Sequence, residues 1–211
     1  MSLKRLFFAL VVRPFLLIVT GTNVRHAERL PQRGPALLIG NHNSHLDTVT
    51  LMSLFPGRML DAIRPAAAAD YFLKSGLVAW FSRTLIGIIP VTRGGRAAGE
   101  DPLAGVSQAL EAGSIVIFFP EGTRGEPERF KEMRSGIFHL SQRHPDVKVV
   151  PVFLHGLGKA LPKGAFLPVP FFCDVFVGEP LERPGDKDAF LLALKERFEA
   201  LRAEGTFPEW E

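Results

Sequence analysis

Three apolar runs without polar alternation constrain the fold of this 211-residue chain more than any other feature. Such a run is expected of a strand that is covered on both faces, as in the parallel sheets of α/β proteins. Strands that alternate with helical stretches indicate a layered fold. We therefore predict a single α/β domain in which a mixed, largely parallel sheet is flanked by helices. The runs are residues 36–39, 114–119 and 147–154.

Turn and capping signals place the remaining elements. Further strands are expected within residues 59–68, 87–95 and 172–177, and helices over residues 45–55, 76–85, 133–143 and 186–204. Another helix is expected between Asp101-Pro102, an N-cap followed by Pro at the first helical position, and Gly113. The length suits one domain with a full-sized core.

A polar block, residues 41–47, follows the first apolar run directly. Ser44 and Asp47 have the spacing of a capping box, so the next helix is expected to begin at His45. His42 then lies in the turn before the cap, and its imidazole can fold back onto Asp47. A carboxylate bonded to one ring nitrogen fixes the tautomer and leaves the other nitrogen as a base. His42 and Asp47 are therefore predicted to be a catalytic dyad, with His45 a surface or supporting residue.

The most apolar stretch is residues 6–20, which Arg13 and Pro14 interrupt. As a helix it would be about 22 Å long, short of the roughly 30 Å hydrocarbon core of a bilayer. An interfacial or re-entrant anchor is favoured over a helix packed on the core, and a spanning helix ranks third. Arg13 also argues against a signal peptide. We divide the chain into a membrane-anchoring segment, residues 1–24, and a domain, residues 25–211.

Composition and charge distribution favour contact with lipid. The apolar fraction of 46% is high for a soluble domain, although a Phe-rich core would also explain it. Six basic residues and one acid precede residue 34, whereas nine acids and five bases follow residue 178. A basic end beside an apolar segment suits an anionic membrane surface. Nucleic acid is a weaker explanation because no known binding motif appears.

The Cys and His content excludes some kinds of site. The single Cys173 excludes an internal disulfide. The six His residues do not have metal-ligand spacing, so no metal is predicted.

Four blocks together resemble the glycerolipid acyltransferase family, that of the bacterial 1-acyl-sn-glycerol-3-phosphate acyltransferases. The segment from His42 to Asp47 looks like the first motif, and residues 87–93, ending in Arg93, look like the second. Phe119-Pro120-Glu121-Gly122-Thr123-Arg124 is similar to the third motif, and Val149-Val150-Pro151-Val152 to the fourth. A His and an Asp at this spacing arise readily by chance, but four blocks in the family's order are a strong signal.

The resemblance implies transfer of a fatty acyl group from a thioester, acyl-CoA or acyl carrier protein, to the hydroxyl of 1-acylglycerol-3-phosphate, giving phosphatidic acid. His42 would be the general base and Asp47 would orient it. No cofactor is implied beyond the thioester co-substrate, and no covalent acyl-enzyme, in agreement with the lack of a Gly-x-Ser-x-Gly motif. The protein would be a peripheral, monotopic one on the cytoplasmic face of the inner membrane, in contact with the lipid surface.

The phosphate of such an acceptor calls for fixed cationic donors, and the planar fork of Arg suits it. Arg93 and Arg124 are the candidates from the motifs, and Lys131 is a weaker helper. Glu121 is expected to hold a substrate hydroxyl or to brace the turn. Gly122 permits close approach of backbone amides to a ligand. The expected substrate-binding set is Arg93, Glu121, Gly122, Thr123, Arg124 and Lys131.

Three other functions stay open. The acceptor could be another lysolipid, such as a lyso-ornithine lipid or a different lysophospholipid. A thioesterase would use water in place of the acceptor, and a lipid-binding module would not catalyse at all. Gly125 stands where the family commonly has Ser, and Gly136 follows Lys131 later than is usual. Both departures concern the recognition of the head group.

Overall fold

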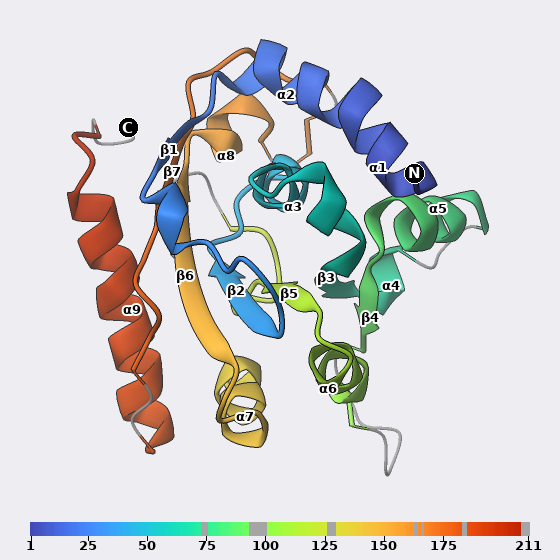
Figure 1. Ribbon diagram of the computed structural model, residues 1–211. Coiled ribbons are helices and arrows are strands. Elements are labelled where there is room, and N and C mark those ends of the chain that lie inside the picture. Colours follow the sequence, from blue (N-terminus) through green and yellow to red (C-terminus); the bar gives the residue numbers. More distant parts are fainter. Residues whose placement is uncertain are drawn as a thin grey trace.

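The computed structural model describes residues 1–72, 76–92, 101–125, 130–162, 164–165, 167–182 and 185–207. A seven-stranded sheet runs through these residues in the order β1-β7-β6-β2-β5-β3-β4 (Figure 1). Neighbouring strands are parallel except for β6 and β7, which are antiparallel. The predicted mixed, largely parallel sheet is therefore confirmed. The strands are β1 (Asn23–Arg25), β2 (Ala36–Gly40), β3 (Ile63–Ala68), β4 (Ile89–Val91), β5 (Ile115–Phe118), β6 (Lys148–His155) and β7 (Asp174–Val177).

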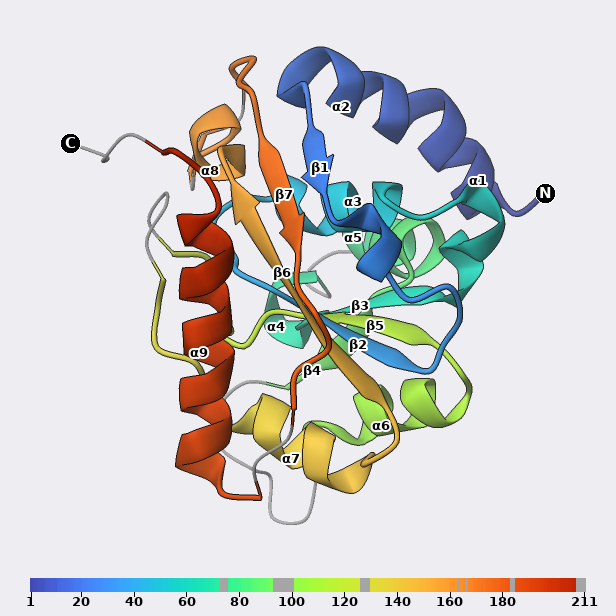
Figure 2. The same ribbon diagram turned by 60° about the vertical axis from the view of Figure 1, so that its left-hand side comes forward.

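Helices cover both faces of this sheet (Figure 2). One face packs against α1 (Leu3–Phe7), η1 (Phe8–Val12), α2 (Arg13–Thr20), α3 (Leu46–Ser53) and α8 (Leu157–Ala160). The other face packs against α6 (Ala104–Glu111), α7 (Gly136–Arg143) and α9 (Lys187–Ala203). The short elements η2 (Ala27–Arg29), η3 (Gly57–Ala62), α4 (Ala69–Phe72), α5 (Gly76–Phe81) and η4 (Ser82–Ile86) complete the description.

Burial on both faces explains the apolar runs. In β2, Leu38 belongs to the core beneath α3, whereas Leu37 and Ile39 belong to the core beneath α6, α7 and α9. Every residue of β2 is buried. Because successive side chains enter opposite cores, no position along the strand faces water and no polar alternation develops.

The N-terminal helices α1, η1 and α2 follow one another without a break. The π-helical turn η1 lies directly before Arg13 and Pro14, where the missing Pro N–H would interrupt regular α-helical bonding. Arg13 donates from Nη2 to the Phe55 carbonyl oxygen at 2.6 Å. Phe8 and Leu16 are buried against the core. The segment therefore packs one face of its helices on the domain, and the membrane anchor stays a prediction. Within the described residues, no helix is both long and apolar enough to cross a membrane.

Several element boundaries differ from expectation. Helix α3 begins at Leu46, one residue later than predicted, and α7 begins at Gly136 instead of residue 133. The backbone N–H of Arg134 donates to the Pro120 carbonyl oxygen at 2.9 Å, which ties residues 131–134 to another loop and keeps them out of the helix. Strand β1 was not predicted. It pairs with β7 and contains the boundary between residues 24 and 25 at which the chain was divided.

Candidate active site

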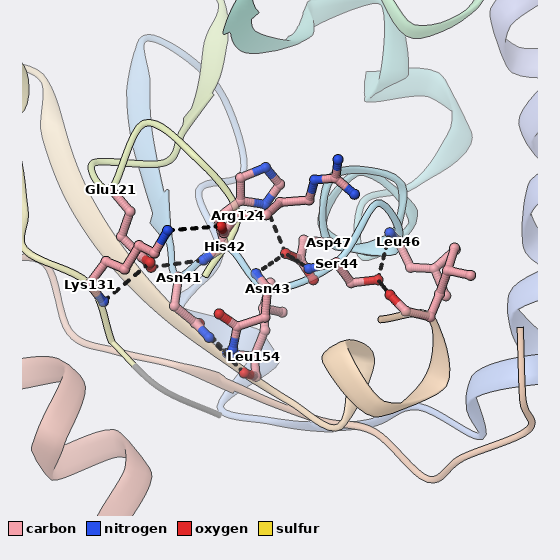
Figure 3. A network of polar contacts seen from close by, with 11 residues as sticks. Asn41, His42, Asn43, Ser44, Leu46, Asp47, Glu121, Arg124, Lys131 and Leu154 are labelled. Atoms are coloured by element: carbon pink, nitrogen blue, oxygen red, sulfur yellow. Dashed lines mark hydrogen bonds and ion pairs between the residues drawn. The ribbon is translucent and has the colours of Figure 1, made fainter. Parts of the chain in front are cut away.

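The loops that follow β2 and β5 meet at one edge of the sheet, beside the end of β6 (Figure 3). Parallel strands place their carboxyl ends on the same side, where α/β proteins gather functional groups. His42 follows β2 and lies in the block that resembles the first family motif. Glu121 follows β5 and lies in the block that resembles the third motif. These two blocks are in direct contact.

His42 and Asp47 form a hydrogen bond between Nδ1 and Oδ2 of 2.9 Å. The Asp47 side chain is 1% exposed, whereas that of His42 is 20% exposed. Since a carboxylate oxygen only accepts, we assign the proton of the neutral ring to Nδ1 and the lone pair to Nε2. The buried carboxylate thus orients an imidazole whose ring remains partly open to solvent.

The same Asp47 oxygen also shapes the turn that carries His42. Oδ2 accepts the backbone N–H groups of Asn43 at 2.7 Å and Ser44 at 2.8 Å. The bond to Ser44 is the return half of the predicted capping box. The Ser44 hydroxyl differs from that pattern, because it accepts from the Leu46 N–H and donates to the Leu161 carbonyl oxygen at 2.9 Å. One carboxylate therefore builds the helix start and orients the imidazole.

The side chain of Asn41 fastens the block to β6. Its Nδ2 donates to the Leu154 carbonyl oxygen at 2.8 Å, and its Oδ1 accepts the Leu154 N–H at 2.7 Å. The side-chain amide thus makes the two hydrogen bonds to the Leu154 backbone that a neighbouring strand would make, just beyond the end of β2. Sequence analysis missed this role because the partner lies 113 residues away. An amide directly after a buried strand is the one signal that could have suggested it.

Phe119 lies against the His42 imidazole, with ring centroids 4.2 Å apart and planes inclined by 20°. A Cβ atom on Gly40 would approach the Phe119 ring to 3.0 Å, so glycine there leaves room for this ring. The Gly125 N–H donates to the His42 carbonyl oxygen at 2.8 Å. Phe119 of the third block therefore holds the ring of His42, a role that its sequence position alone does not reveal, and Gly125 holds the backbone.

Glu121 is 4% exposed, and both of its carboxylate oxygens accept backbone N–H groups. Oε1 accepts from His42 at 2.9 Å, and Oε2 accepts from Lys131 at 3.3 Å. Burial raises the pKa of Glu121 to about 7, because a charged carboxylate is poorly solvated there, although these two bonds act in the opposite direction.

The basic side chains of Arg124, in the third block, and of Lys131, after it, lie close to this network. The Lys131 Nζ donates to the Arg124 carbonyl oxygen at 3.1 Å and contacts the Thr123 hydroxyl at 3.5 Å. Figure 3 shows the Arg124 guanidinium on the same side of the turn as the His42 imidazole. Of the two expected arginines, Arg124 is thus near the dyad, and Arg93 lies outside the described residues.

Gly122 has a backbone conformation that favours glycine, with φ of 69°, and the Arg134 side chain lies over it. A Cβ atom there would approach Arg134 Nε to 3.1 Å. His45, at the start of α3, is exposed. In the part of the chain that the structure describes, no cluster of three or more His, Cys, Asp or Glu side chains could hold a metal ion.

A protein-family model described as Acyltransferase matches residues 21–155. The chloroplastic 1-acyl-sn-glycerol-3-phosphate acyltransferase of Arabidopsis thaliana is 30% identical over 169 residues, which are 77% of this chain and 43% of that protein. The human 1-acyl-sn-glycerol-3-phosphate acyltransferase alpha is 29% identical over 134 residues, which are 62% of this chain and 44% of that protein. The matches span less than half the length of these relatives.

The fold resembles the crystal structure of the 1-acyl-sn-glycerophosphate (LPA) acyltransferase PlsC from Thermotoga maritima. The TM-score is 0.74 with 18% sequence identity, over 98% of this chain and 80% of that one. At this identity the similarity concerns the fold.

Proposed function

Because the chain belongs to the acyltransferase family, we propose that it transfers a fatty acyl group from an acyl thioester to the free hydroxyl of 1-acylglycerol-3-phosphate, giving phosphatidic acid. The observation that carries this proposal is the hydrogen bond between His42 Nδ1 and the buried Asp47 carboxylate. It is the arrangement required of a general base whose second nitrogen acts on substrate.

In the proposed reaction, Nε2 of His42 accepts the proton of the acceptor hydroxyl while its oxygen attacks the thioester carbonyl carbon. The new C–O bond forms, the C–S bond then breaks, and the imidazolium returns its proton to the leaving thiolate. Asp47 stabilises the imidazolium between these two transfers. General base catalysis of this kind contributes roughly 10²–10⁴-fold in rate.

The acceptor phosphate is proposed to bind beside the third block. Arg124 and Lys131 supply positive charge next to the dyad, with Thr123 and the backbone at Gly122 close by. Arg93 is proposed to contribute a second guanidinium. A fixed phosphate would place the acceptor hydroxyl at His42, and such positioning removes a large part of the entropic barrier of a reaction between two molecules.

The protein is further proposed to act as a peripheral, monotopic membrane protein on the cytoplasmic face of the inner membrane. The N-terminal helices expose Leu17 and Ile18, which are 79% and 76% accessible. The loop after α8 runs beside them, because the Phe171 N–H donates to the Val19 carbonyl oxygen at 2.9 Å. We call the six most exposed of the described apolar side chains of α2, η1 and this loop the apolar outer surface: Leu10, Leu17, Ile18, Leu167, Val169 and Phe172. An apolar surface of this kind favours insertion into the interface of a bilayer.

An activity screen tests the function directly. The purified protein is incubated with vesicles and a labelled acyl group on CoA or on acyl carrier protein, with one lysolipid acceptor at a time. We expect phosphatidic acid when 1-acylglycerol-3-phosphate is present, and the two donors identify the thioester used. Acylation only of lyso-ornithine lipid or of another lysophospholipid would contradict the acceptor. Release of free fatty acid unaffected by any acceptor would contradict acyl transfer and indicate a thioesterase.

A further inference from the structure

The Glu121 carboxylate joins two loops that are far apart in the sequence. It lies in the turn after β5, and its Oε1 accepts the backbone N–H of His42, which is 79 residues away. Its Oε2 accepts the backbone N–H of Lys131. The residue is 4% exposed, and both carboxylate oxygens are engaged by backbone donors.

The backbone of His42 is thus held from both sides by the third block and by Gly125, the residue that follows it. Glu121 accepts its N–H, and Gly125 donates to its carbonyl oxygen at 2.8 Å. Phe119, from the same block, lies against its imidazole. The bond to Asp47 fixes the direction of the ring, but it cannot fix the position of the whole residue relative to the basic side chains around Arg124.

The second oxygen of Glu121 supplies that connection. Oε2 accepts the backbone N–H of Lys131 and so fixes the backbone of this residue. The Nζ of the same Lys131 reaches the Thr123 hydroxyl and the Arg124 carbonyl oxygen. The backbone N–H groups of His42 and Lys131 are therefore bonded to one buried carboxylate, and Lys131 Nζ in turn contacts the backbone oxygen of Arg124. The acceptor hydroxyl is proposed to sit at a fixed distance from its bound phosphate. A fixed distance between His42 and the phosphate-binding residues therefore favours the reaction, because a small misplacement of reacting groups lowers the rate.

We propose that Glu121 is a positioning residue, which sets the place of His42 relative to Arg124 and Lys131 and does not itself bind the acceptor. This inference rests on the proposed acyl transfer. The sequence left two roles open for Glu121, to hold a substrate hydroxyl or to brace the turn. The inference assigns the second role, and we call the two bonds from Glu121 to the His42 and Lys131 N–H groups the brace.

The ionisation of Glu121 offers a way to detect the brace. The ionised form accepts both N–H groups, whereas the protonated acid carries an O–H donor and cannot serve both donors equally well. Burial raises the pKa of Glu121 to about 7, with the Asp47 charge adding to the rise and Lys131 opposing it. The brace is thus strong at pH 8 and weaker at pH 6.

The first test is Glu121→Gln in the full chain. The amide oxygen can accept one N–H, but the amide NH₂ faces the other as a second donor, so one bond is lost. We expect kcat to fall roughly 10–100-fold at pH 8, with KM for 1-acylglycerol-3-phosphate within about two-fold, because misplacement of the base affects the chemical step. The ratio of wild-type to variant kcat should shrink at pH 6, where Glu121 of the wild type is itself largely neutral.

Two controls make the outcomes decisive. Glu121→Asp keeps the charge on a shorter side chain, so its kcat should lie between those of Glu121→Gln and the wild type. If Glu121→Gln does not fold, Glu121→Asp is measured in its place and should show a lower kcat than the wild type. Arg124→Ala should raise KM instead. An increase in KM for Glu121→Gln with unchanged kcat would overturn the inference, because it would show contact with the acceptor. Unchanged kcat and KM in a folded variant would overturn it equally.

A readout without activity separates this inference from the proposed function. The amide proton of His42, bonded to a carboxylate, should shift in NMR spectra with a midpoint near pH 7 in the wild type and lose that titration in Glu121→Gln. If no acceptor is acylated but this titration is seen, the brace stands and the acyl transfer fails. A His42 amide that responds equally in both proteins would overturn the brace.

Discussion

His42 Nδ1 lies 2.9 Å from Asp47 Oδ2, and this one carboxylate oxygen also accepts the backbone N–H groups of Asn43 and Ser44. The group that orients the imidazole is therefore the group that forms the turn. Any loss of Asp47 must affect both, and only a substitution that keeps an acceptor at the same place can separate them.

Asp47→Asn is such a substitution. With its carbonyl oxygen in the position of Oδ2, Asn retains all three acceptor bonds but loses the charge that stabilises the imidazolium. Its NH₂ would replace Oδ1, which has no hydrogen-bond partner among the described residues, at a cost of about 1–3 kcal/mol. We expect kcat to fall roughly 10²–10⁴-fold, with a single cooperative urea transition retained. A variant with wild-type kcat would show that the charge is not used.

Asn41→Ala is expected to destabilise the fold by roughly 2–4 kcal/mol, since the Leu154 N–H and carbonyl oxygen would both lose a buried partner. Urea unfolding measures the difference. Asn23→Ala is the matched control, because the Asn23 side chain bonds Asp174 at an exposed site and its removal should cost less than about 1 kcal/mol. Equal losses in the two variants would contradict the role of Asn41.

Arg124→Ala is expected to raise KM for 1-acylglycerol-3-phosphate roughly ten-fold or more, because a hydrogen bond to a charged phosphate is lost. Lys131→Ala should act in the same direction but less strongly, since it lacks the planar fork. Lys195→Ala, at an exposed position of α9, serves as the control of equal charge change. Steady-state kinetics with varied acceptor provide the measurement, and an unchanged KM in the Arg124 variant would count against a phosphate site there.

The apolar outer surface can be tested by vesicle sedimentation. Replacing both Leu17 and Ile18 by Ser removes two of its most exposed side chains and should lower the bound fraction on anionic vesicles several-fold. Leu192→Ser is the control, because Leu192 is 56% exposed on α9, away from that surface. The same bound fraction for the double variant and the control would argue against insertion through α2.

His155 should make the protein sensitive to acid. Burial, assisted by the Lys159 charge, lowers the pKa of His155 to about 4 from the value of 6.5 in an unfolded chain. Between these values the unfolded state binds the proton and the folded state does not, so the free energy of unfolding falls as pH decreases from 6.5 to 4, by up to about 3 kcal/mol.

The matching variant is His155→Gln, which cannot take up that proton. We expect urea unfolding at pH 7 and pH 4.5 to show a smaller loss of stability for the variant than for the wild type. His139→Gln, at an exposed site, should lose as much as the wild type. A variant as acid-sensitive as the wild type would contradict the buried neutral imidazole.

Local relationships were predictable from the sequence, and distant ones were not. His42 and Asp47 are five residues apart, so a capped turn suffices to infer their contact. Strands β2, β5 and β6 were recognisable because burial on both faces leaves an unbroken apolar run. The role of Glu121 depends on a partner 79 residues away, and no periodicity encodes such a contact.

Strand β1 shows the same limit in the fold. Its sequence, Asn23-Val24-Arg25, is short and mostly polar, with no pattern that indicates a strand. Its extended form comes from pairing with β7, where Asn23 lies opposite Asp174. The late start of α7 is similar, since the bond from Arg134 to Pro120 overrides the local helical preference. In each case a tertiary contact decides what local sequence leaves open.

The transfer of a labelled acyl group by His42→Ala tests the central claim most directly. The variant is compared with the wild type and with His45→Ala, an exposed histidine of the same block, after circular dichroism and urea unfolding have shown all three to be folded. We expect phosphatidic acid formation to fall roughly 10²–10⁴-fold in His42→Ala and to remain near wild type in His45→Ala. Wild-type turnover by a folded His42→Ala protein would contradict the assignment of His42 as the base.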